Sequence, residues 1–166
     1  IDPRALNELL HRQIAPNADR DQLGLGIAAS PGAATGRIVF TAAEAQASAA
    51  RNEACDLVRR ETSPEDIRGM HAASAVLTER GGTSSHAAVI ARGLGLPCVV
   101  GANSFRFQTR LNLLTAPDGR VFKPGDIITV DGSNGAILAG APEMMEAAVD
   151  DAFQTLLNWA DAVRDI

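Results

Sequence analysis

Aromatic residues and lysine are scarce in this chain of 166 residues. Aromatic residues make up 4% of it, with no tyrosine and one tryptophan, and Lys123 is the single lysine. Proteins that bind single-stranded nucleic acid stack bases on aromatic side chains, and nucleic-acid partners in general attract a basic protein face. Because the net charge is −5, the sequence argues against a nucleic acid as the partner.

Long apolar runs and clustered cysteines are also absent. A membrane-spanning helix needs about 18 consecutive apolar residues, and no run here approaches that length, so we expect no membrane segment. Cys55 and Cys98 lie far apart in separate apolar runs, which predicts buried free thiols in a reducing, cytoplasmic compartment. No His/Cys cluster has zinc spacing and no P-loop is present, so we expect neither a metal site nor a self-contained nucleotide site.

The length limits the architecture to one domain of ordinary size, because a complete (β/α)₈ barrel needs about 250 residues. The sequence begins with Ile1 rather than methionine and shows no leader, so we expect a module cut from a longer chain. Hydrophobic periodicity and turn residues predict three parts. These are a linker helix in residues 1–23, a mixed α/β core in 24–140 and a second linker helix in 141–166.

Inside the core, short apolar runs alternate with helix-start signals. Strands are predicted over residues 24–29, 36–40, 55–58, 75–78, 98–100, 120–123, 127–130 and 136–138. Helices are predicted over residues 41–51, from Ser63, and from His86 to Gly93, because capping residues precede each of them. The first arm helix is expected to include Ile14, and the second to begin at Pro142. Residues 103–117 show no regular pattern, and we assign them no role.

The densest group of anion-binding residues lies between the strands predicted over 75–78 and 98–100. Gly81 and Gly82 let successive backbone N–H groups converge on an anion. Ser84 or Ser85 is expected to cap the following helix and to offer a hydroxyl to a phosphate. That helix begins at His86, and a helix N-terminus favours a bound phosphate.

Two arginines flank this loop. Arg92, and equally Arg80, could contact phosphate oxygens, and the alternative for each is an ion pair on the surface. Together these residues indicate that the imidazole of His86 accepts a phosphoryl group and passes it on. His71 is expected to play a structural role and to pack beneath the site.

Residues 75–101, AVLTERGGTSSHAAVIARGLGLPCVVG, resemble the phosphohistidine segment of the phosphoenolpyruvate (PEP)-utilising enzymes. His86 falls on the phosphorylated histidine of that motif. The run ETSPEDI at residues 61–67, together with Gly93, is similar to the pyruvate phosphate dikinases within this group. Ser84 stands where the dikinases carry a regulatory threonine, and its hydroxyl leaves regulation at this position open.

The resemblance implies a swivelling β/β/α domain with terminal helical arms that carries a phosphoryl group on His86. Its partners would be an ATP-grasp domain and a barrel that binds pyruvate or PEP, both in the same full-length chain. Mg²⁺ would act in those partner domains and not in this one. The overall reaction would interconvert ATP, phosphate and pyruvate with AMP, diphosphate and PEP, and this chain alone is expected not to turn over.

Two other interpretations stay open. The first is the same domain from a PEP synthase or a related PEP-dependent phosphotransferase, and residues 61–67 and Gly93 count against it. The second is a swivelling interaction module without chemistry, and an intact His86 with its glycine loop counts against that. A carrier requires His86 to lie on the surface, so its exposure is a structural test. The sequence leaves the oligomeric state open, with a homodimer of the full-length protein as one alternative.

Overall fold

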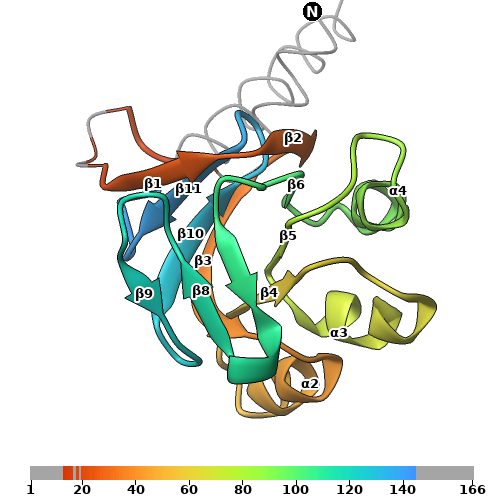
Figure 1. The fold of residues 1–166 in the computed structure, drawn as a ribbon. Helices are drawn as coiled ribbons and strands as arrows, with labels where there is room; N and C mark the ends of the chain where they lie inside the picture. Colours follow the sequence, from red (N-terminus) through yellow and green to blue (C-terminus); the bar gives the residue numbers. More distant parts are fainter. Residues whose placement is uncertain (1–12, 17, 19, 145–166) are drawn as a thin grey trace, which may run out of the picture.

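An eight-stranded sheet organises the core of this computed structural model, which describes residues 13–16, 18 and 20–144 (Figure 1). The strand order is β1-β11-β10-β3-β4-β5-β6-β2, and the four neighbours from β3 to β6 run parallel. The strands are β1 (Gln22–Leu25), β2 (Ile27–Ser30), β3 (Ala33–Val39), β4 (Cys55–Arg59), β5 (Ala75–Thr78), β6 (Cys98–Val100), β10 (Ile127–Asp131) and β11 (Ala136–Ala139). The predicted mixed α/β class is confirmed.

One chain segment closes this sheet, because its two outer strands, β1 and β2, follow each other directly in the chain. β1 pairs with β11 and β2 pairs with β6, so the bend at Gly26 carries the chain from one edge to the other. A Cβ at Gly26 would lie 2.6 Å from Cγ1 of Val99 and 2.9 Å from the carbonyl oxygen of Val100. The single strand predicted over residues 24–29 is therefore divided where only glycine fits.

Helices cover the outer face of the parallel strands (Figure 1). They are α2 (Ala42–Ala50), the short 3₁₀ turn η1 (Pro64–Asp66), α3 (Ile67–Ala72) and α4 (His86–Leu94). On α4 the buried side chains are Ala87, Ala88 and Ala91, whose small size lets the helix lie close to the sheet. Within the described part of the chain, no helix is long and apolar enough to cross a membrane.

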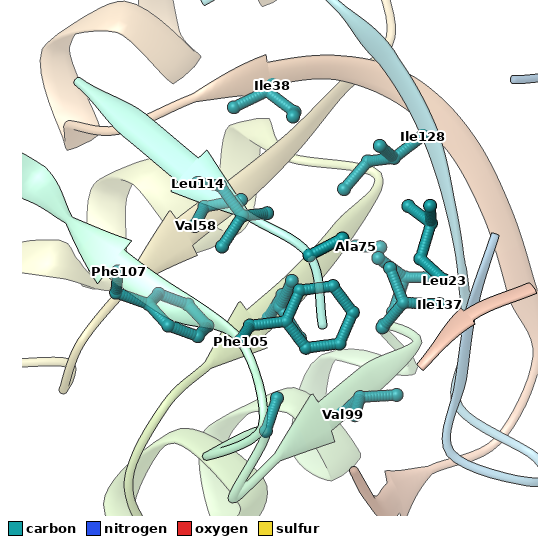
Figure 2. Packing of buried hydrophobic residues seen from close by; sticks show 14 of the residues in the cluster. Leu23, Ile38, Val58, Ala75, Val99, Phe105, Phe107, Leu114, Ile128 and Ile137 are labelled. Atoms are coloured by element: carbon teal, nitrogen blue, oxygen red, sulfur yellow. The ribbon is translucent and has the colours of Figure 1, made fainter. Parts of the chain in front are cut away.

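The inner face of the sheet encloses an apolar interior, shown in Figure 2. A second sheet covers it with Phe107 and Leu114, and Phe105 packs beside them from the preceding segment. This sheet has the order β7-β8-β9. Its elements are β7 (Arg106–Gln108), the 3₁₀ turn η2 (Thr109–Leu111), β8 (Leu113–Thr115) and β9 (Val121–Phe122). The region without a predicted pattern thus forms the cover of the core.

The two ends of the described chain meet beside the sheet. Ile14 and Met144 form an isolated antiparallel bridge, and Ile14 is buried against Ala33 and Leu138. The prediction that Ile14 is helical and that a helix begins at Pro142 is wrong, because this bridge pairs the two segments with each other. The rest of both predicted arm helices lies outside the described residues.

Candidate functional site

The loop singled out in the sequence lies where β4 and β5 end. These strands are parallel neighbours, so the segments that follow them leave the sheet side by side. The N–H of Arg80 donates a hydrogen bond of 3.0 Å to the carbonyl oxygen of Arg60, which ties the two segments together. Residues that lie about twenty positions apart in the sequence therefore meet at the carboxyl edge of the parallel strands.

His86 is the first residue of α4 and is exposed, as a carrier histidine requires. Its Nδ1 lies 3.4 Å from Oγ1 of Thr62, which belongs to the segment after β4. Because the two ring nitrogens point in different directions, this contact leaves Nε2 directed away from Thr62. Sequence reasoning missed the role of Thr62, and the available signal was a hydroxyl directly after a strand that neighbours the histidine loop.

Of the two glycines in the loop, Gly81 is the one that the geometry requires. Its φ is +106°, and a Cβ there would lie 2.9 Å from both Cβ and Oγ of Ser85. At Gly82 a Cβ would meet nothing within 4 Å, and the conformation there is not left-handed. The carbonyl oxygen of Gly82 accepts a hydrogen bond of 3.0 Å from the N–H of Ser85 and so closes the turn.

Ser85, rather than Ser84, caps α4. Its backbone is extended, and its Oγ accepts a hydrogen bond of 3.4 Å from the N–H of Ala88. Ser84 is exposed in the loop, two positions before His86. Ser85 therefore fixes the start of the helix, and the phosphate contacts of both serines stay predictions.

Arg92 joins the loop to the sheet. Its Nη1 donates a hydrogen bond of 3.0 Å to the carbonyl oxygen of Ala29 in β2, and its Nη2 donates one of 2.5 Å to that of Thr83 in the loop. Both terminal nitrogens are thus engaged with carbonyl oxygens. The phosphate contact predicted for Arg92 stays a prediction, and the role visible in the structure is to hold the loop.

Arg80 has looser partners. Its Nη1 lies 4.0 Å from Glu61 and its Nε lies 3.9 Å from Glu79, while the side chain is 62% exposed. Glu79 also faces Arg60 at 3.5 Å. Exposed ion pairs at such distances contribute little to stability, so they constrain the charge of Arg80 only weakly.

His71 does not pack beneath this site. It is exposed in the last turn of α3, where it lines a hollow of about 480 Å³ together with Ser74 and residues 94–97. This hollow lies at the amino ends of β3, β5 and β6, whereas His86 lies at the carboxyl edge. The expectation that His71 supports the site from below is wrong, because the end of α3 lies at the opposite edge of the parallel strands.

Acidic residues in the described part of the chain do not gather into a metal site. No group of three or more His, Cys, Asp or Glu side chains there could hold a metal ion. The carboxylate of Asp126 accepts a hydrogen bond of 2.8 Å from the N–H of Lys123, and that of Asp131 accepts one of 3.0 Å from Ser133. Each carboxylate stabilises a turn beside a strand.

Burial changes the protonation of several groups in the sheet. Asp56 in β4 is completely buried without a hydrogen-bond partner among the described residues, and desolvation raises its pKa well above the usual value. Burial also raises the pKa of Asp131, although its hydrogen bond with Ser133 opposes the shift. Desolvation raises the pKa of Cys55 to about 11 and that of Cys98 to about 12. Both are free buried thiols, as predicted, and at neutral pH they stay protonated.

Comparison with known proteins points to the same segment. A family model described as "PEP-utilising enzyme, mobile domain" matches residues 53–135. A pyruvate, phosphate dikinase of Rhizobium meliloti is 52% identical over 164 residues, which cover 99% of this chain and 18% of that protein. The dikinase of Clostridium symbiosum is 44% identical over 168 residues, which cover 100% of this chain and 19% of that protein.

The match to solved structures is weaker. The solution structure of an Enzyme I protein is 26% identical with a TM-score of 0.38, and the match covers 65% of this chain and 38% of that one. The dikinase matches therefore carry the comparison. This chain spans about a fifth of the length of those two relatives, so they contain further sequence outside the match.

Proposed function

The chain belongs to the family of PEP-utilising enzyme mobile domains, and from that premise we propose that it is the phosphoryl-carrying module of a pyruvate phosphate dikinase. His86 accepts a phosphoryl group from one module of the full-length protein and donates it to another. The observation that carries this proposal is the exposed imidazole of His86, oriented through Nδ1 by the hydroxyl of Thr62. Relatives about five times as long as this chain support the existence of the other modules.

The contact with Thr62 gives the two ring nitrogens of His86 different roles. When neutral imidazole is protonated at Nδ1, that N–H donates to Oγ1 of Thr62 and the lone pair of Nε2 is the nucleophile. As Nε2 forms its bond to phosphorus, the bond from phosphorus to the leaving oxygen breaks, and the exposed ring releases the Nδ1 proton to bulk water. The hydroxyl then donates to the Nδ1 lone pair, because a threonine hydroxyl both accepts and donates. Thr62 thereby orients the ring before and after transfer.

The loop before His86 supplies donors to the transferred group. The first turn of α4 presents N–H groups without helical partners, and these favour an anion. We assign further contacts with the phosphoryl oxygens to the N–H groups of Gly81, Gly82 and Ser84 and to the hydroxyls of Ser84 and Ser85. We assign most of the electrostatic stabilisation of the transition state to the partner modules.

Transfer between two modules requires the domain to move. In-line displacement needs the nucleophile within about 3.5 Å of phosphorus, and one fixed position cannot satisfy this in two separate sites. The pairing of the chain ends supports a swivelling domain, because Ile14 bridges Met144 and the N–H of Ala15 donates to Glu143 at 2.8 Å. Rotation about the paired segments at Ile14 and Met144 would carry His86 between the two sites without separating these segments from each other.

The full-length protein would supply the other components. The proposed partners are an ATP-grasp domain and a barrel that binds pyruvate or PEP, each working with Mg²⁺. The overall reaction would interconvert ATP, phosphate and pyruvate with AMP, diphosphate and PEP, so this chain alone would not turn over. The free thiols of Cys55 and Cys98 support a cytoplasmic location.

Transfer from isotopically labelled PEP tests the proposal. The chain is mixed with Mg²⁺ and with a separately expressed variant of the Rhizobium meliloti relative. In that variant the segment that matches this chain is deleted. We expect a phosphoryl adduct on the chain that is labile in acid and stable in base. His86→Ala abolishes it, whereas His71→Ala, which removes an exposed imidazole at the other edge, leaves it intact. An adduct that persists in His86→Ala overturns the assignment.

A further inference from the structure

Arg80 and Arg92 both flank the histidine loop, but only Arg80 is weakly held. Both terminal nitrogens of Arg92 donate to carbonyl oxygens, whereas the ion pairs of Arg80 among the described residues are with the exposed Glu61 at 4.0 Å and the partly buried Glu79 at 3.9 Å. We propose that Arg80 changes partners when His86 is phosphorylated. Its guanidinium then leaves the carboxylates of Glu61 and Glu79 and pairs with the phosphoryl oxygens. This inference deepens the carrier function proposed above and depends on it for its biological meaning.

Arg80 and His86 each contact one of two consecutive residues after β4. Glu61 Oε2 lies 4.0 Å from Arg80 Nη1, and Thr62 Oγ1 lies 3.4 Å from His86 Nδ1. The Cα atoms of adjacent residues are about 3.8 Å apart. The guanidinium of Arg80 and the imidazole of His86 therefore both contact the dipeptide Glu61-Thr62. The exchange that we propose requires the exposed Arg80 side chain to rotate from Glu61 toward the neighbouring position at which Thr62 contacts His86.

The loop brings the same two residues together from the other side. Gly81 follows Arg80, Ser85 precedes His86, and a Cβ on Gly81 would lie 2.9 Å from Cβ of Ser85. The loop thus returns the chain to its starting point before α4 begins. Arg80 and His86 consequently stand at the two ends of a closed loop rather than along an extended one.

Charge favours the exchange. Arg80 is 62% exposed and Glu61 is 71% exposed, and ion pairs between such groups are weak. A phosphoryl group adds nearly two negative charges at neutral pH and three acceptor oxygens, and arginine pairs with such groups through two parallel hydrogen bonds. After the exchange Glu61 is a like charge beside the phosphoryl group. Arg80 then favours the dianion of that group, and Glu61 opposes it.

A chemically formed adduct tests these opposite effects without any partner module. Phosphoramidate transfers its phosphoryl group to an imidazole nitrogen, so a P–N bond to the ring forms, the P–N bond to ammonia breaks, and ammonia takes up the ring proton. The chain has three histidines, and replacing His11 and His71 by Gln leaves His86 as the only acceptor. The ³¹P NMR signal of the adduct is then followed against pH at low salt.

The midpoint of that titration is the readout. Arg80→Gln raises it by about half a pH unit relative to the parent, Arg80→Lys restores most of the difference, and Glu61→Gln lowers it. High salt reduces these differences because the groups are exposed. The matched control is Arg37→Gln, since Arg37 pairs with Glu53 at 3.8 Å at the amino end of β4, and it leaves the midpoint unchanged.

Two results overturn the proposal. One is an unchanged midpoint in Arg80→Gln, and the other is an equal shift in Arg37→Gln, which would reflect net charge alone. Failure of the carrier function is distinguishable, because phosphoramidate reacts with an accessible imidazole whether or not PEP-dependent transfer occurs. A chain that accepts nothing from labelled PEP but shows the Arg80 shift would contradict only the carrier function.

Discussion

Each edge of the parallel strands presents one exposed histidine, and the two histidines sit at opposite ends of their helices. At the carboxyl edge His86 begins α4, so N–H groups of the first helical turn face the loop. At the amino edge His71 lies in the last turn of α3, and the hollow beside it also receives the end of α4. Helix C-termini carry partial negative charge, which disfavours a phosphate. Exposure of an imidazole is therefore insufficient for a phosphoryl carrier. The imidazole must also lie at a helix N-terminus, where a phosphate is favoured, rather than at a helix C-terminus.

The charged side chains follow the same division. Around the carboxyl edge, Arg60 and Arg80 alternate with Glu61 and Glu79 in loose ion pairs. The hollow at the amino edge is lined by glycine, alanine and other apolar residues, and its polar side chains are His71 and Ser74. An added phosphoryl group thus finds arginines in loose ion pairs beside His86, whereas no arginine or lysine of the described residues lines the hollow beside His71.

The largest effect that would sharpen this comparison is expected at Gly81. Gly81→Ala forces a Cβ to within 2.9 Å of Ser85 at a φ of +106°, so the loop and the start of α4 must shift. A displacement of about 1 Å at a reacting group costs about a hundredfold in rate, and we expect transfer from labelled PEP to slow by that order. Gly93→Ala is the matched control, because Gly93 lies outside the loop and its Cβ would meet nothing within 4 Å. Equal rates in the two variants would contradict the structural role of Gly81.

The interior between the two edges should respond to pH through Asp56. Its pKa is well above the unfolded value of 3.8, so between these two values the folded state binds more protons than the unfolded state. The contribution of Asp56 to the free energy of unfolding is therefore fully present below about pH 4 and is lost as pH rises through its folded-state pKa. Asp56 contributes at most about 1.4 kcal/mol per pH unit to this slope.

Urea unfolding at several pH values measures that slope. Asp56→Asn keeps the shape of the side chain and removes its titration, so the stability of the variant falls less steeply with pH. Asp131→Asn serves as the comparison, because the pKa of Asp131 is raised in the same direction while a hydrogen bond from Ser133 opposes the shift. Parallel pH profiles for Asp56→Asn and the parent chain would show that Asp56 does not titrate differently on folding.

The smallest effect concerns the orientation of the reactive ring. Thr62→Val removes a single long hydrogen bond to Nδ1 of His86 and keeps the side-chain shape. Such a bond contributes about 1 kcal/mol, so transfer from labelled PEP should slow about fivefold. Ser74→Ala removes a hydroxyl at the amino edge and should leave the rate unchanged. If Thr62→Val and Ser74→Ala slowed transfer equally, the claim that only the carboxyl edge takes part in phosphoryl transfer would be wrong.

The segment around the histidine could be predicted because its signals are local. The strand at Ala75–Thr78, the helix start at His86 and the strand at Cys98–Val100 appear with the predicted bounds. Apolar runs of strand length, a serine cap and Gly95 in the left-handed region specify them within a few residues. The capping pattern at Thr41 succeeded for the same reason, since its hydroxyl accepts from the N–H of Glu44.

The cover of the core could not be predicted, because distant contacts determine it. The strand predicted over residues 120–123 appears as β9 (Val121–Phe122), but β7 and β8 have three residues each, too few for a periodic pattern. They are held by the burial of Phe107 and Leu114 in the interior of the other sheet. The bridge between Ile14 and Met144 likewise joins residues 130 positions apart, so local helix signals around each were misleading.

The candidate site divides in the same manner. His86 and the two glycines were found from one continuous motif, whereas the contact with Thr62 depends on how β4 and β5 align. The motif also could not distinguish Arg80 from Arg92. Only the positions of the carbonyl oxygens of Ala29 and Thr83 show which of the two guanidinium groups is engaged.

The bend at Gly26 also bears on aggregation. An exposed edge strand is a template on which a strand of another molecule can pair, and long flat edges make such association persistent. Here the outer strands of the large sheet, β1 and β2, have four residues each, and the chain turns away between them. The carrier role proposed above requires repeated encounters with other protein surfaces, and edges this short limit the risk that a brief encounter becomes a permanent intermolecular sheet.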